Sequence, residues 1–460
     1  MRLRRICLRR ICLSIWFLAA AMACSGDSDK ADDDGGDDVG DDVGDDGGDD
    51  GGDDGGDDGG DDGGDDGGDD GGDDGGDDGG DDLTDDERVL RAGISGEIDA
   101  AEALATVASS GGLPVVTADG TFLFACLCGP PSGEYWSVAG DHDDWVGSPM
   151  SEGAGDLWWV ELAIDSPDGS RYKMTDGDTW MADPRGLRYD FDEFGRLSYV
   201  QMTGAHLERF YDVAGGGLAP RDVRVYVPED GEFTHMLIAH DGQNLFDPEA
   251  IWGGWHLQDS VPEQVLIVAI DNTSDRMDEY THVADDLGSG ALGGRAADYA
   301  VLVEDVVLVD ARARYGQEQV LGTMGSSLGG LVSVALADHS PGVYDMAISL
   351  SGTMGWGSIG TDNETIVERY AAAGHRDTAL YLDSGGSGTT CADSDGDGVP
   401  DDDPDARDNY CENVWFRDEL ESVGYVFDED LWHWHEPGAT HDEAAWADRV
   451  WRPLEIFAGL

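Results

Sequence analysis

Short apolar runs alternate with amphipathic stretches throughout residues 206–460. The apolar runs have the length of strands, and the stretches between them repeat apolar residues with helical spacing. This alternation predicts an α/β domain built on a mostly parallel sheet. The predicted strands are 223–227, 234–239, 265–270, 320–324, 346–350 and 379–382, and the predicted helices are 296–314, 328–338, 412–423 and 443–457.

The pattern is different ahead of this domain. Residues 119–205 contain short strand-like segments separated by turns, which favours a β-sandwich. Residues 83–118 are predicted to be a helical lead-in. Thr84 and Glu87 have the spacing of a capping box, and residues 98–107 continue a helical pattern.

Residues 1–23 have the pattern of an export signal. Five arginines in the first ten residues precede an apolar run that is shorter than the ~20 apolar residues of a membrane-spanning helix. The run ends at Ala21-Met22-Ala23-Cys24, which resembles the lipobox of bacterial lipoproteins. The resemblance implies that Cys24 is acylated and anchors the chain to a membrane, with Ser25 directing it to the outer membrane or cell surface. Soluble secretion, with Cys24 an ordinary thiol, is the alternative.

Residues 24–82 are predicted to be a disordered linker, since most of them are repeats of Asp-Asp-Gly-Gly. This composition offers almost no apolar surface to offset the entropy of ordering, and the like charges extend the chain. The chain as a whole has 100 acidic and 26 basic residues and a formal net charge of −74. Such a charge argues against nucleic acid as a partner, because nucleic-acid binding requires a basic surface.

The strongest chemical signal is the segment Gly325-Ser326-Ser327-Leu328-Gly329-Gly330. An apolar strand pattern precedes it and an apolar helix pattern follows it. Small residues on both sides of Ser327 allow a tight turn, which lifts the hydroxyl above the sheet at the N-terminus of a helix. The alternative is a simple turn. The strand-turn-helix context predicts that Ser327 is a nucleophile.

A serine hydroxyl needs a base to take its proton, and on this type of fold the order along the chain is serine, acid, histidine. His441 follows a glycine-containing turn and is the predicted base. His433 and His435 are competitors, but they lie within the strand-like run 431–435. Asp383 and Asp408 are both candidates for the acid.

Acyl transfer also requires hydrogen-bond donors for the developing oxyanion. The backbone N–H of Leu328, directly after the nucleophile, is one predicted donor. The second is assigned to Gln243, in the turn that follows the predicted strand 234–239. An ordinary polar loop is the alternative for that turn.

Several segments together resemble the esterase family that includes enterochelin esterases, feruloyl and acetyl carbohydrate esterases and S-formylglutathione hydrolase. They are 240–247, 275–280, the turn at Ser327 and the terminal His441. The resemblance covers residues 206–460 and implies a three-layer α/β-hydrolase domain with a Ser-Asp-His triad and no catalytic cofactor. It implies an acid shortly before a helix, which corresponds best to Asp408. An insertion between Asp383 and Asp408 departs from the family pattern.

The strand-like region 119–205 resembles the early-set, immunoglobulin-like modules related to glycogen-binding domains, which precede esterase domains in the enterochelin esterase family. The similarity is carried by residues 135–145 and by the tryptophans around 158 and 180. It implies a β-sandwich. Its tryptophans form either a face that stacks on carbohydrate or a part of the core and of the interdomain packing.

The insertion before Asp408 has the spacing of a calcium loop. Carboxylates at positions one, three, five and nine, a backbone carbonyl at seven and a glycine at six are the expected features. The corresponding predicted ligands are Asp393, Asp395, Asp397, Val399 and Asp401. Pro404 occupies the position of the usual glutamate, so Asp403 or Asp405 must replace it. The alternative to structural calcium is a solvated acidic loop.

Four cysteines follow Cys24, an even number that suits disulfide bonds in an oxidising compartment. Cys391 and Cys411 are the predicted pair, because they bracket one loop. Cys126 and Cys128 are so close in sequence that a bridge between them would be strained, and their pairing is left open.

Together these features predict an exported serine esterase whose partners are an ester substrate and, through its lipid anchor, a membrane. The family resemblance implies feruloyl, acetyl or siderophore-type esters as substrates. Two alternatives stay open: a non-catalytic surface carbohydrate-binding lipoprotein with a decayed hydrolase domain, and an acyltransferase. The sequence carries no signal for the oligomeric state.

Overall fold

Strands from both predicted domains join one mixed sheet. The computed structural model describes residues 83–388, 391–393, 400 and 408–460, all of which belong to one compact unit. Within these residues, the strand order is β20 (Leu431–His435), β19 (Ala379–Ser384), β18 (Met346–Leu350), β17 (Val320–Ser326), β13 (His235–His240), β14 (Val265–Ile270), β12 (Arg221–Val227), β11 (His206–Val213), β9 (Arg188–Asp192), β10 (Gly195–Tyr199), β7 (Arg171–Thr175), β3 (Ser137–Gly140) and β4 (Ser148–Pro149), with β8 (Trp180–Met181) beside β7.

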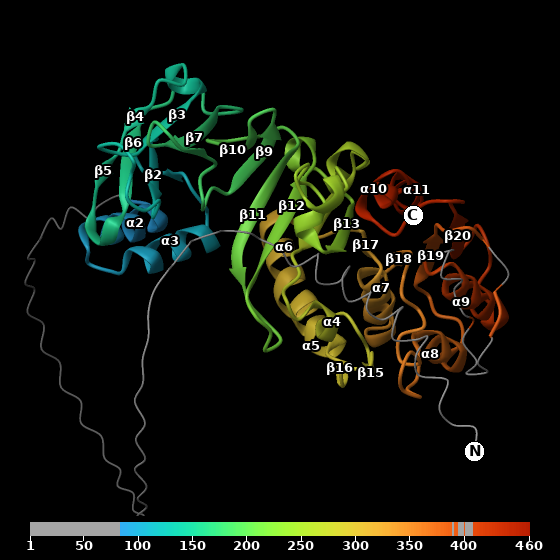
Figure 1. Ribbon diagram of the computed structural model, residues 1–460. Coiled ribbons are helices and arrows are strands. Elements are labelled where there is room, and N and C mark those ends of the chain that lie inside the picture. Colours follow the sequence, from blue (N-terminus) through green and yellow to red (C-terminus); the bar gives the residue numbers. More distant parts are fainter. Residues whose placement is uncertain (1–82, 389–390, 394–399, 401–407) are drawn as a thin grey trace, which may run out of the picture. The chain divides into compact units, whose positions relative to one another are not determined.

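The strands that precede the predicted chemistry form the parallel part of this sheet. Strands β14, β13, β17, β18, β19 and β20 all pair in parallel, whereas β12 and β11 join antiparallel. Figure 1 shows this succession from β11 to β20. Because the carboxyl ends of parallel strands lie on one edge, the loops after β13, β17, β18, β19 and β20 meet there.

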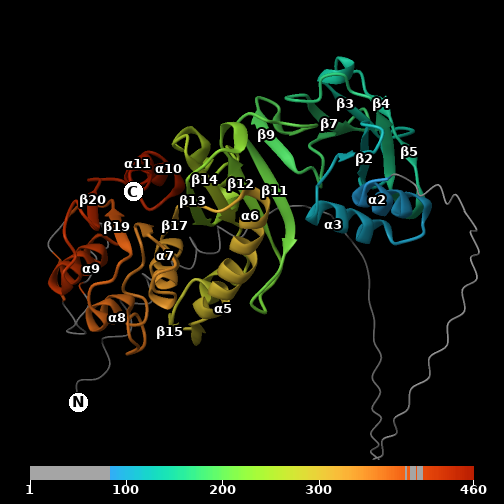
Figure 2. The same cartoon turned by 180° about the vertical axis from the view of Figure 1, so that it is seen from behind.

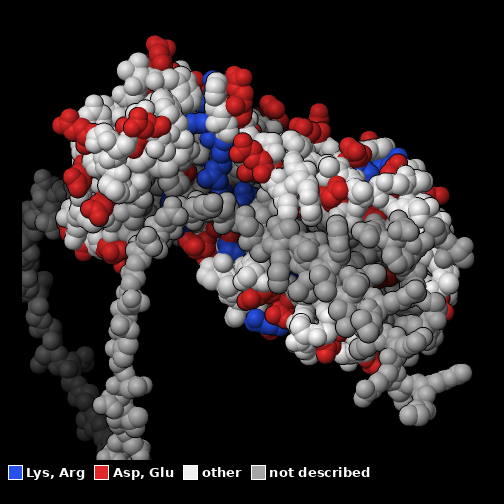
Figure 3. Space-filling view, viewed as in Figure 1, with Lys and Arg blue, Asp and Glu red and all other residues white. Residues whose placement is uncertain are grey.

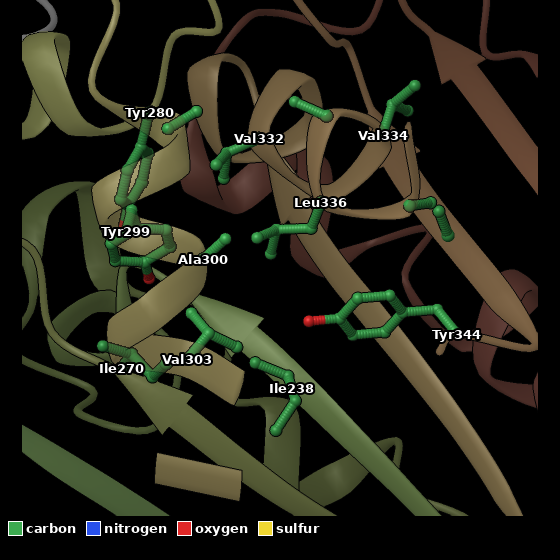
Figure 4. Packing of buried hydrophobic residues seen from close by; sticks show 14 of the residues in the cluster. Ile238, Ile270, Tyr280, Tyr299, Ala300, Val303, Val332, Val334, Leu336 and Tyr344 are labelled. Atoms are coloured by element: carbon green, nitrogen blue, oxygen red, sulfur yellow. The ribbon is translucent and has the colours of Figure 1, made fainter. Parts of the chain in front are cut away.

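Alternate side chains of the parallel strands enter two separate cores. In β14, Val265, Ile267 and Ala269 belong to one core, and Leu266, Val268 and Ile270 belong to the other. Burial of such aliphatic side chains contributes about 1.5–3 kcal/mol each, so the strand is fixed between two apolar layers. Figure 4 shows part of the second core, where Ile238 and Ile270 of the sheet lie near Val303 and Leu336 of the covering helices.

Helices cover both faces of the parallel strands, and Figure 2 shows them from behind. One face packs against α5 (Ala296–Val301), η7 (Leu302–Val307), α6 (Leu308–Tyr315), α7 (Leu328–His339), α8 (Ile366–Ala373) and α9 (Tyr410–Val423). The other packs against α10 (Glu443–Ala447), α11 (Trp451–Phe457) and the segment 245–257. The short α4 (Arg276–Glu279) and the hairpin β15 (Ala284–Asp286)–β16 (Ala291–Gly293) also pack against the core of the first face, through Met277 and Leu292. The predicted three-layer α/β-hydrolase fold is confirmed.

Two of the predicted helices are not continuous α-helices. Residues 296–314 contain a π-helical stretch, η7, between α5 and α6. Residues 443–457 are divided into α10 and α11. Pro453 lies in the first turn of α11 and has no N–H to donate to the carbonyl of Arg449, so a single unbroken helix cannot form through this point.

Residues 83–205 contain a second, smaller sheet that packs on the first. Its strand order is β1 (Val115–Val116), β2 (Phe122–Cys126), β6 (Trp158–Leu162) and β5 (Ser151–Glu152). Phe122 and Phe124 of β2 pack toward the large sheet, while Leu123 and Ala125 pack against α2 (Asp85–Ser95) and α3 (Ala100–Ser109). The predicted capping residue Thr84 accepts a hydrogen bond from the N–H of Glu87 at 3.2 Å. The immunoglobulin-like relationship of the sandwich and the domain boundaries stay predictions.

The tryptophans of the sandwich divide between core and surface. Trp136 and Trp158 are buried in the core between the two sheets. Trp145 and Trp180 contact each other with ring centroids 6.3 Å apart, and Trp180 is 47% exposed. Trp136 and Trp158 are therefore part of the core, as one of the two interpretations expects, whereas Trp145 and Trp180 lie at the surface.

Two disulfide bonds lie within the described residues. Cys391 is bonded to Cys411 with their Cα atoms 5.3 Å apart, as predicted. Cys126 is bonded to Cys128, a pairing that the sequence left open. None of the helices in the described part of the chain is long and apolar enough to cross a bilayer.

Acidic side chains are scattered over the face in Figure 3, and basic side chains gather in one band near β9–β11. Two arginines of these strands are paired with acids. Arg188 lies 3.3 Å from Glu208, and the Arg209 guanidinium pairs with Asp222. The charges of Arg188 and Arg209 are therefore compensated within the protein.

Candidate active site

Ser327 lies at the turn between β17 and α7. Its φ of 55° and ψ of −121° are outside the regions that a residue with a side chain normally adopts. Its N–H donates to the carbonyl of Leu350 at 2.9 Å, which ties the turn to the end of the neighbouring strand β18. Such a strained backbone persists only where the surrounding structure fixes it, and this is common at functional sites.

The glycines on both sides of Ser327 lie in tightly packed surroundings. A Cβ atom on Gly325 would lie 2.6 Å from the carbonyl carbon of Gly329, closer than two carbon atoms can approach. A Cβ atom on Gly329 would lie 3.1 Å from Oδ2 of Asp241. The strand-turn-helix geometry expected from the sequence is present, and no larger residue fits at Gly325.

His441 is brought together with Asp408. Its Nδ1 lies 2.7 Å from Oδ1 of Asp408, whose side chain is fully buried, while the imidazole is 18% exposed. A carboxylate accepts at this distance, so Nδ1 carries the proton and Nε2 carries the lone pair of the neutral imidazole. The imidazole also contacts the Trp446 ring edge to face at 5.0 Å.

Asp383, the other candidate acid, is held elsewhere. Its Oδ2 accepts from Nε of Arg449 at 3.1 Å, and its Oδ1 accepts from the N–H of Ser351 at 3.2 Å. Burial raises the pKa of Asp383 to about 6, although Arg449 opposes this shift. Of the two candidates, Asp408 is the one bonded to His441.

The competing histidines both lie in strand β20. Burial lowers the pKa of His433 to about 4. Nε2 of His435 lies 3.2 Å from the carbonyl of Gly386, and its ring contacts Tyr410 at 4.4 Å. Neither has a described contact with Asp408.

A chain of hydrogen bonds connects the turn of Ser327 to His441. From Ser327 it passes to Leu350 of β18, then through the next residue, Ser351, whose Oγ donates to Oδ2 of Asp408 at 2.7 Å. Asp408 then accepts from His441. The predicted nucleophile, base and acid therefore share the carboxyl edge of the parallel strands.

The predicted oxyanion donors lie on two adjacent segments of this edge. Leu328 is the first residue of α7, so no carbonyl of its own helix can accept from its N–H. Gln243 lies in the short helix η4 (Gly242–Asn244), and its Oε1 accepts from the N–H of Asn272 at 3.0 Å. Asp241, one residue before η4, packs against Gly329 of α7. The two segments are in contact.

An ion pair fixes the segment before η4. Arg276 donates to both carboxylate oxygens of Asp241, each at 2.7 Å, and Asp241 adopts a left-handed φ of 62°. Both side chains are 7% exposed. A two-bond arginine–carboxylate pair has a defined orientation, so it holds the backbone that leads to Gln243.

Glu443 is a buried carboxyl group that sequence reasoning missed. It lies in the first turn of α10, two residues after His441, and its Oε1 accepts from Nδ2 of Asn244 at 3.3 Å. Burial raises the pKa of Glu443 to about 7, and the nearby charge of Asp241 adds to the shift. Glu443 thus links the segment of the predicted base to η4.

Most residues of the predicted calcium loop lie outside the described part of the chain. Asp393 is described and exposed, whereas Asp395, Asp397, Val399 and Asp401 are not described. Among the described residues, no group of three or more His, Cys, Asp or Glu side chains could hold a metal ion. The predicted lipid site, Cys24, also lies outside the described residues.

The family of this chain follows from a sequence comparison. The family model described as "Putative esterase" matches residues 219–449, a span that includes the Ser327 turn, Asp408 and His441. The chain belongs to this esterase family. Membership of this family makes the protein a hydrolase of carboxylic esters.

Solved structures also match this esterase. The IroE-like serine hydrolase from Shewanella oneidensis is 17% identical, with a TM-score of 0.42 over 55% of this chain and 80% of that one. The ferric enterobactin esterase from Salmonella typhimurium is 16% identical, with a TM-score of 0.39 over 75% and 95% of the two chains. The siderophore hydrolase EstB from Aspergillus nidulans is 16% identical, with a TM-score of 0.38 over 55% and 94%. No match was found among curated proteins.

Proposed function

We propose that this protein is a serine esterase in which Ser327, His441 and Asp408 act as a triad. The observation that supports this most strongly is the 2.7 Å contact between Nδ1 of His441 and Oδ1 of Asp408, at the sheet edge that also carries Ser327. This contact selects the tautomer in which Nε2 takes the serine proton.

The reaction proceeds in two acyl transfers. Oγ of Ser327 attacks the acyl carbon while His441 removes its proton, and the N–H groups of Leu328 and Gln243 stabilise the oxyanion. The intermediate collapses when His441 returns the proton to the leaving alcohol, which leaves an acyl-serine. Water, deprotonated by His441, then releases the acid and restores Ser327. Asp408 orients the imidazole and stabilises its charged form, and no cofactor enters either step.

The proposed substrates are esters on carbohydrates, with feruloyl or acetyl groups, or siderophore-type esters. This follows the family resemblance carried by residues 240–247, 275–280 and the Ser327 turn. A screen of the three ester types with the purified protein selects among them through kcat/KM.

We also propose that the protein acts outside the cytoplasm, held to a membrane through an acylated Cys24, and that the 393–401 loop binds calcium. The disulfide between Cys391 and Cys411 supports an oxidising compartment. Palmitate labelling that persists in Cys24→Ala contradicts the anchor. An unfolding temperature that calcium does not raise contradicts the metal site.

The test of the serine mechanism is labelling by a fluorophosphonate probe together with p-nitrophenyl acetate turnover. Ser327→Ala is expected to lose both. Ser326→Ala, which removes the hydroxyl of the preceding residue, is the matched control and is expected to keep labelling. Turnover that survives in Ser327→Ala contradicts the serine mechanism, and a wild-type protein with neither activity indicates a decayed site. Transfer of the acyl group to an added alcohol, in place of hydrolysis, indicates an acyltransferase.

A further inference from the structure

Arg449 is a buried cation shared by two buried carboxylates. It lies between α10 and α11, and its side chain is 2% exposed. Its Nε donates to Oδ2 of Asp383 at 3.1 Å, and its Nη2 donates to Oδ2 of Asp408 at 3.2 Å. Asp383 is the second candidate acid and Asp408 is the one bonded to His441, so one guanidinium connects both.

Ser351 completes this arrangement directly after β18. It is fully buried and has a left-handed φ of 51°. Its Oγ donates to Oδ2 of Asp408 at 2.7 Å and accepts from Nη2 of Arg449 at 2.6 Å and from Nε1 of Trp446 at 3.0 Å. The N–H of Gly385 also donates to the same carboxylate oxygen.

The two oxygens of Asp408 therefore have separate partners. Oδ2 receives donors from Ser351, Gly385 and Arg449, while Oδ1 receives the Nδ1–H of His441. Hydrogen bonds to a carboxylate favour its charged form and fix its plane. The carboxylate plane in turn fixes the direction in which the imidazole is held.

Two carboxyl groups that share a buried site cannot both ionise readily without a cation. Burial raises the pKa of Asp383 to about 6, Arg449 lowers it, and the charge of Asp408 adds to the increase. The pKa of Arg449 is raised by the two carboxylates even though burial opposes this. The guanidinium is thus the counter-charge of Asp383 and a direct hydrogen-bond donor to Asp408.

We propose that Arg449 is a positioning residue of the esterase site, which holds the Asp408 side chain in the orientation that meets His441 and holds Asp383 as its structural partner. This inference rests on the proposed triad. Nε of Arg449 donates a hydrogen bond to Asp383, and Nη2 donates to both Asp408 and Ser351. These bonds require the planar fork of the arginine guanidinium. The ammonium group of a lysine keeps the charge but cannot reproduce this geometry.

The experiment measures kcat and KM across pH with p-nitrophenyl acetate for Arg449→Met, Arg449→Lys and the double variant Arg449→Met/Asp383→Asn. In Arg449→Met we expect kcat to fall about 10²-fold, the effect of a misplaced catalytic group, with little change in KM. Loss of the buried positive charge favours protonation of the site as a whole, so the acidic limb of the pH–rate profile moves to higher pH.

The other variants separate positioning from general damage. Arg449→Lys is expected to lose less activity than Arg449→Met, and the double variant, which removes one of the two acids, is expected to return the acidic limb toward that of the wild type. Arg209→Met is the matched control: it breaks the ion pair with Asp222 in β11 and β12, distant in the sheet order from β17–β20. It is expected to lose stability and keep the wild-type pH profile.

The inference is overturned if a folded Arg449→Met has the wild-type kcat and pH profile. Should that variant not fold, the other two variants provide the test. A wild-type kcat in Arg449→Lys overturns the inference. An acidic limb that moves further from wild type in Arg449→Met/Asp383→Asn also overturns it. Fluorophosphonate labelling of Ser327 in each variant keeps the two proposals apart. Turnover that persists in Ser327→Ala contradicts the triad itself, whereas intact labelling with an unchanged Arg449→Met contradicts only the role of Arg449.

Discussion

Nδ1 of His441 lies 2.7 Å from Oδ1 of Asp408, although 33 positions separate the two residues. The parallel strands β19 and β20 bring them together, since Asp408 follows the first and His441 follows the second. This relationship distinguishes Asp408 from Asp383, and it makes the assignment of the acid testable.

Asp408→Asn is expected to lower kcat about 10³-fold with little change in KM, because an amide cannot hold the imidazole in the same tautomer and charge state. Asp383→Asn is the comparison, since Asp383 contacts Arg449 and Ser351 rather than His441. A steady-state analysis of both variants on one ester measures the difference. If Asp383→Asn causes the larger loss, the roles of the two acids are reversed.

Gly325→Ala is expected to lower the unfolding temperature and to reduce kcat/KM at least 10²-fold, because the new Cβ must displace the backbone of Gly329 beside Ser327. Gly459→Ala is the matched control: the nearest atom to its Cβ would be the carbonyl oxygen of Ile456 at 3.3 Å, after the end of α11. Thermal unfolding and ester hydrolysis measure both effects. Normal activity in Gly325→Ala contradicts a tight turn at the nucleophile.

Glu443→Gln is expected to change how stability depends on pH. The pKa of Glu443 rises from its ordinary value of 4.5 to about 7 on folding, so the native state holds this proton more tightly than the unfolded chain. Its favourable contribution is complete below pH 4.5 and is lost as the pH rises through 7, a change of about 3 kcal/mol. The variant stays neutral, so relative to wild type it becomes more stable as the pH rises from 4.5 to 8.

Urea denaturation of the Glu443→Gln variant at both pH values provides the measurement. A difference between variant and wild type that is the same at pH 4.5 and at pH 8 contradicts the raised pKa. The N–H groups of Asn244 still find an acceptor in the glutamine oxygen, so the hydrogen bond at 3.3 Å is preserved and the comparison isolates the charge.

Replacement of Cys391 and Cys411 by serine is expected to lower the free energy of unfolding by about 3 kcal/mol, because the bond closes a loop with a sequence separation of 20. Turnover is expected to fall as well, since Asp408 lies inside this loop. The control replaces Cys126 and Cys128, which are separated by two positions and lie in the sandwich. Denaturant unfolding and kcat are measured for both, and equal turnover in the two variants contradicts a link between the bond and Asp408.

The sequence predicts the parts of this fold that depend on local pattern. The apolar runs 265–270 and 346–350 coincide with β14 and β18, because strands buried on both faces are continuously apolar. The turn at Ser327 is predictable because its glycines and the apolar helix pattern that follows are next to it in the sequence. His441 is predicted as the base because it follows a glycine-containing turn after the strand-like run 431–435.

The residues that the sequence did not reveal act through contacts between distant segments. Arg449 and Ser351 are 98 positions apart, and Glu443 and Asn244 are 199 apart. A single buried arginine in a helical pattern carries no local signal for its two acidic partners. The division of α10 from α11 is different, because Pro453 is a local signal that a helix begins close to this residue and does not run unbroken from residue 443 to 457.

The pairing of β9 with β11, at Tyr189–Leu207 and Arg188–Glu208, has a consequence for anyone who wishes to shorten this protein. A fragment that starts at residue 206 exposes the backbone donors and acceptors of β11. Unpaired strand edges can form hydrogen bonds with strands of other chains, which leads to aggregation. The N-terminal strands thus cover the edge of β11 that such a fragment would expose. A minimal catalyst needs a substitute for them, such as a lysine or proline placed on the outer edge of β11.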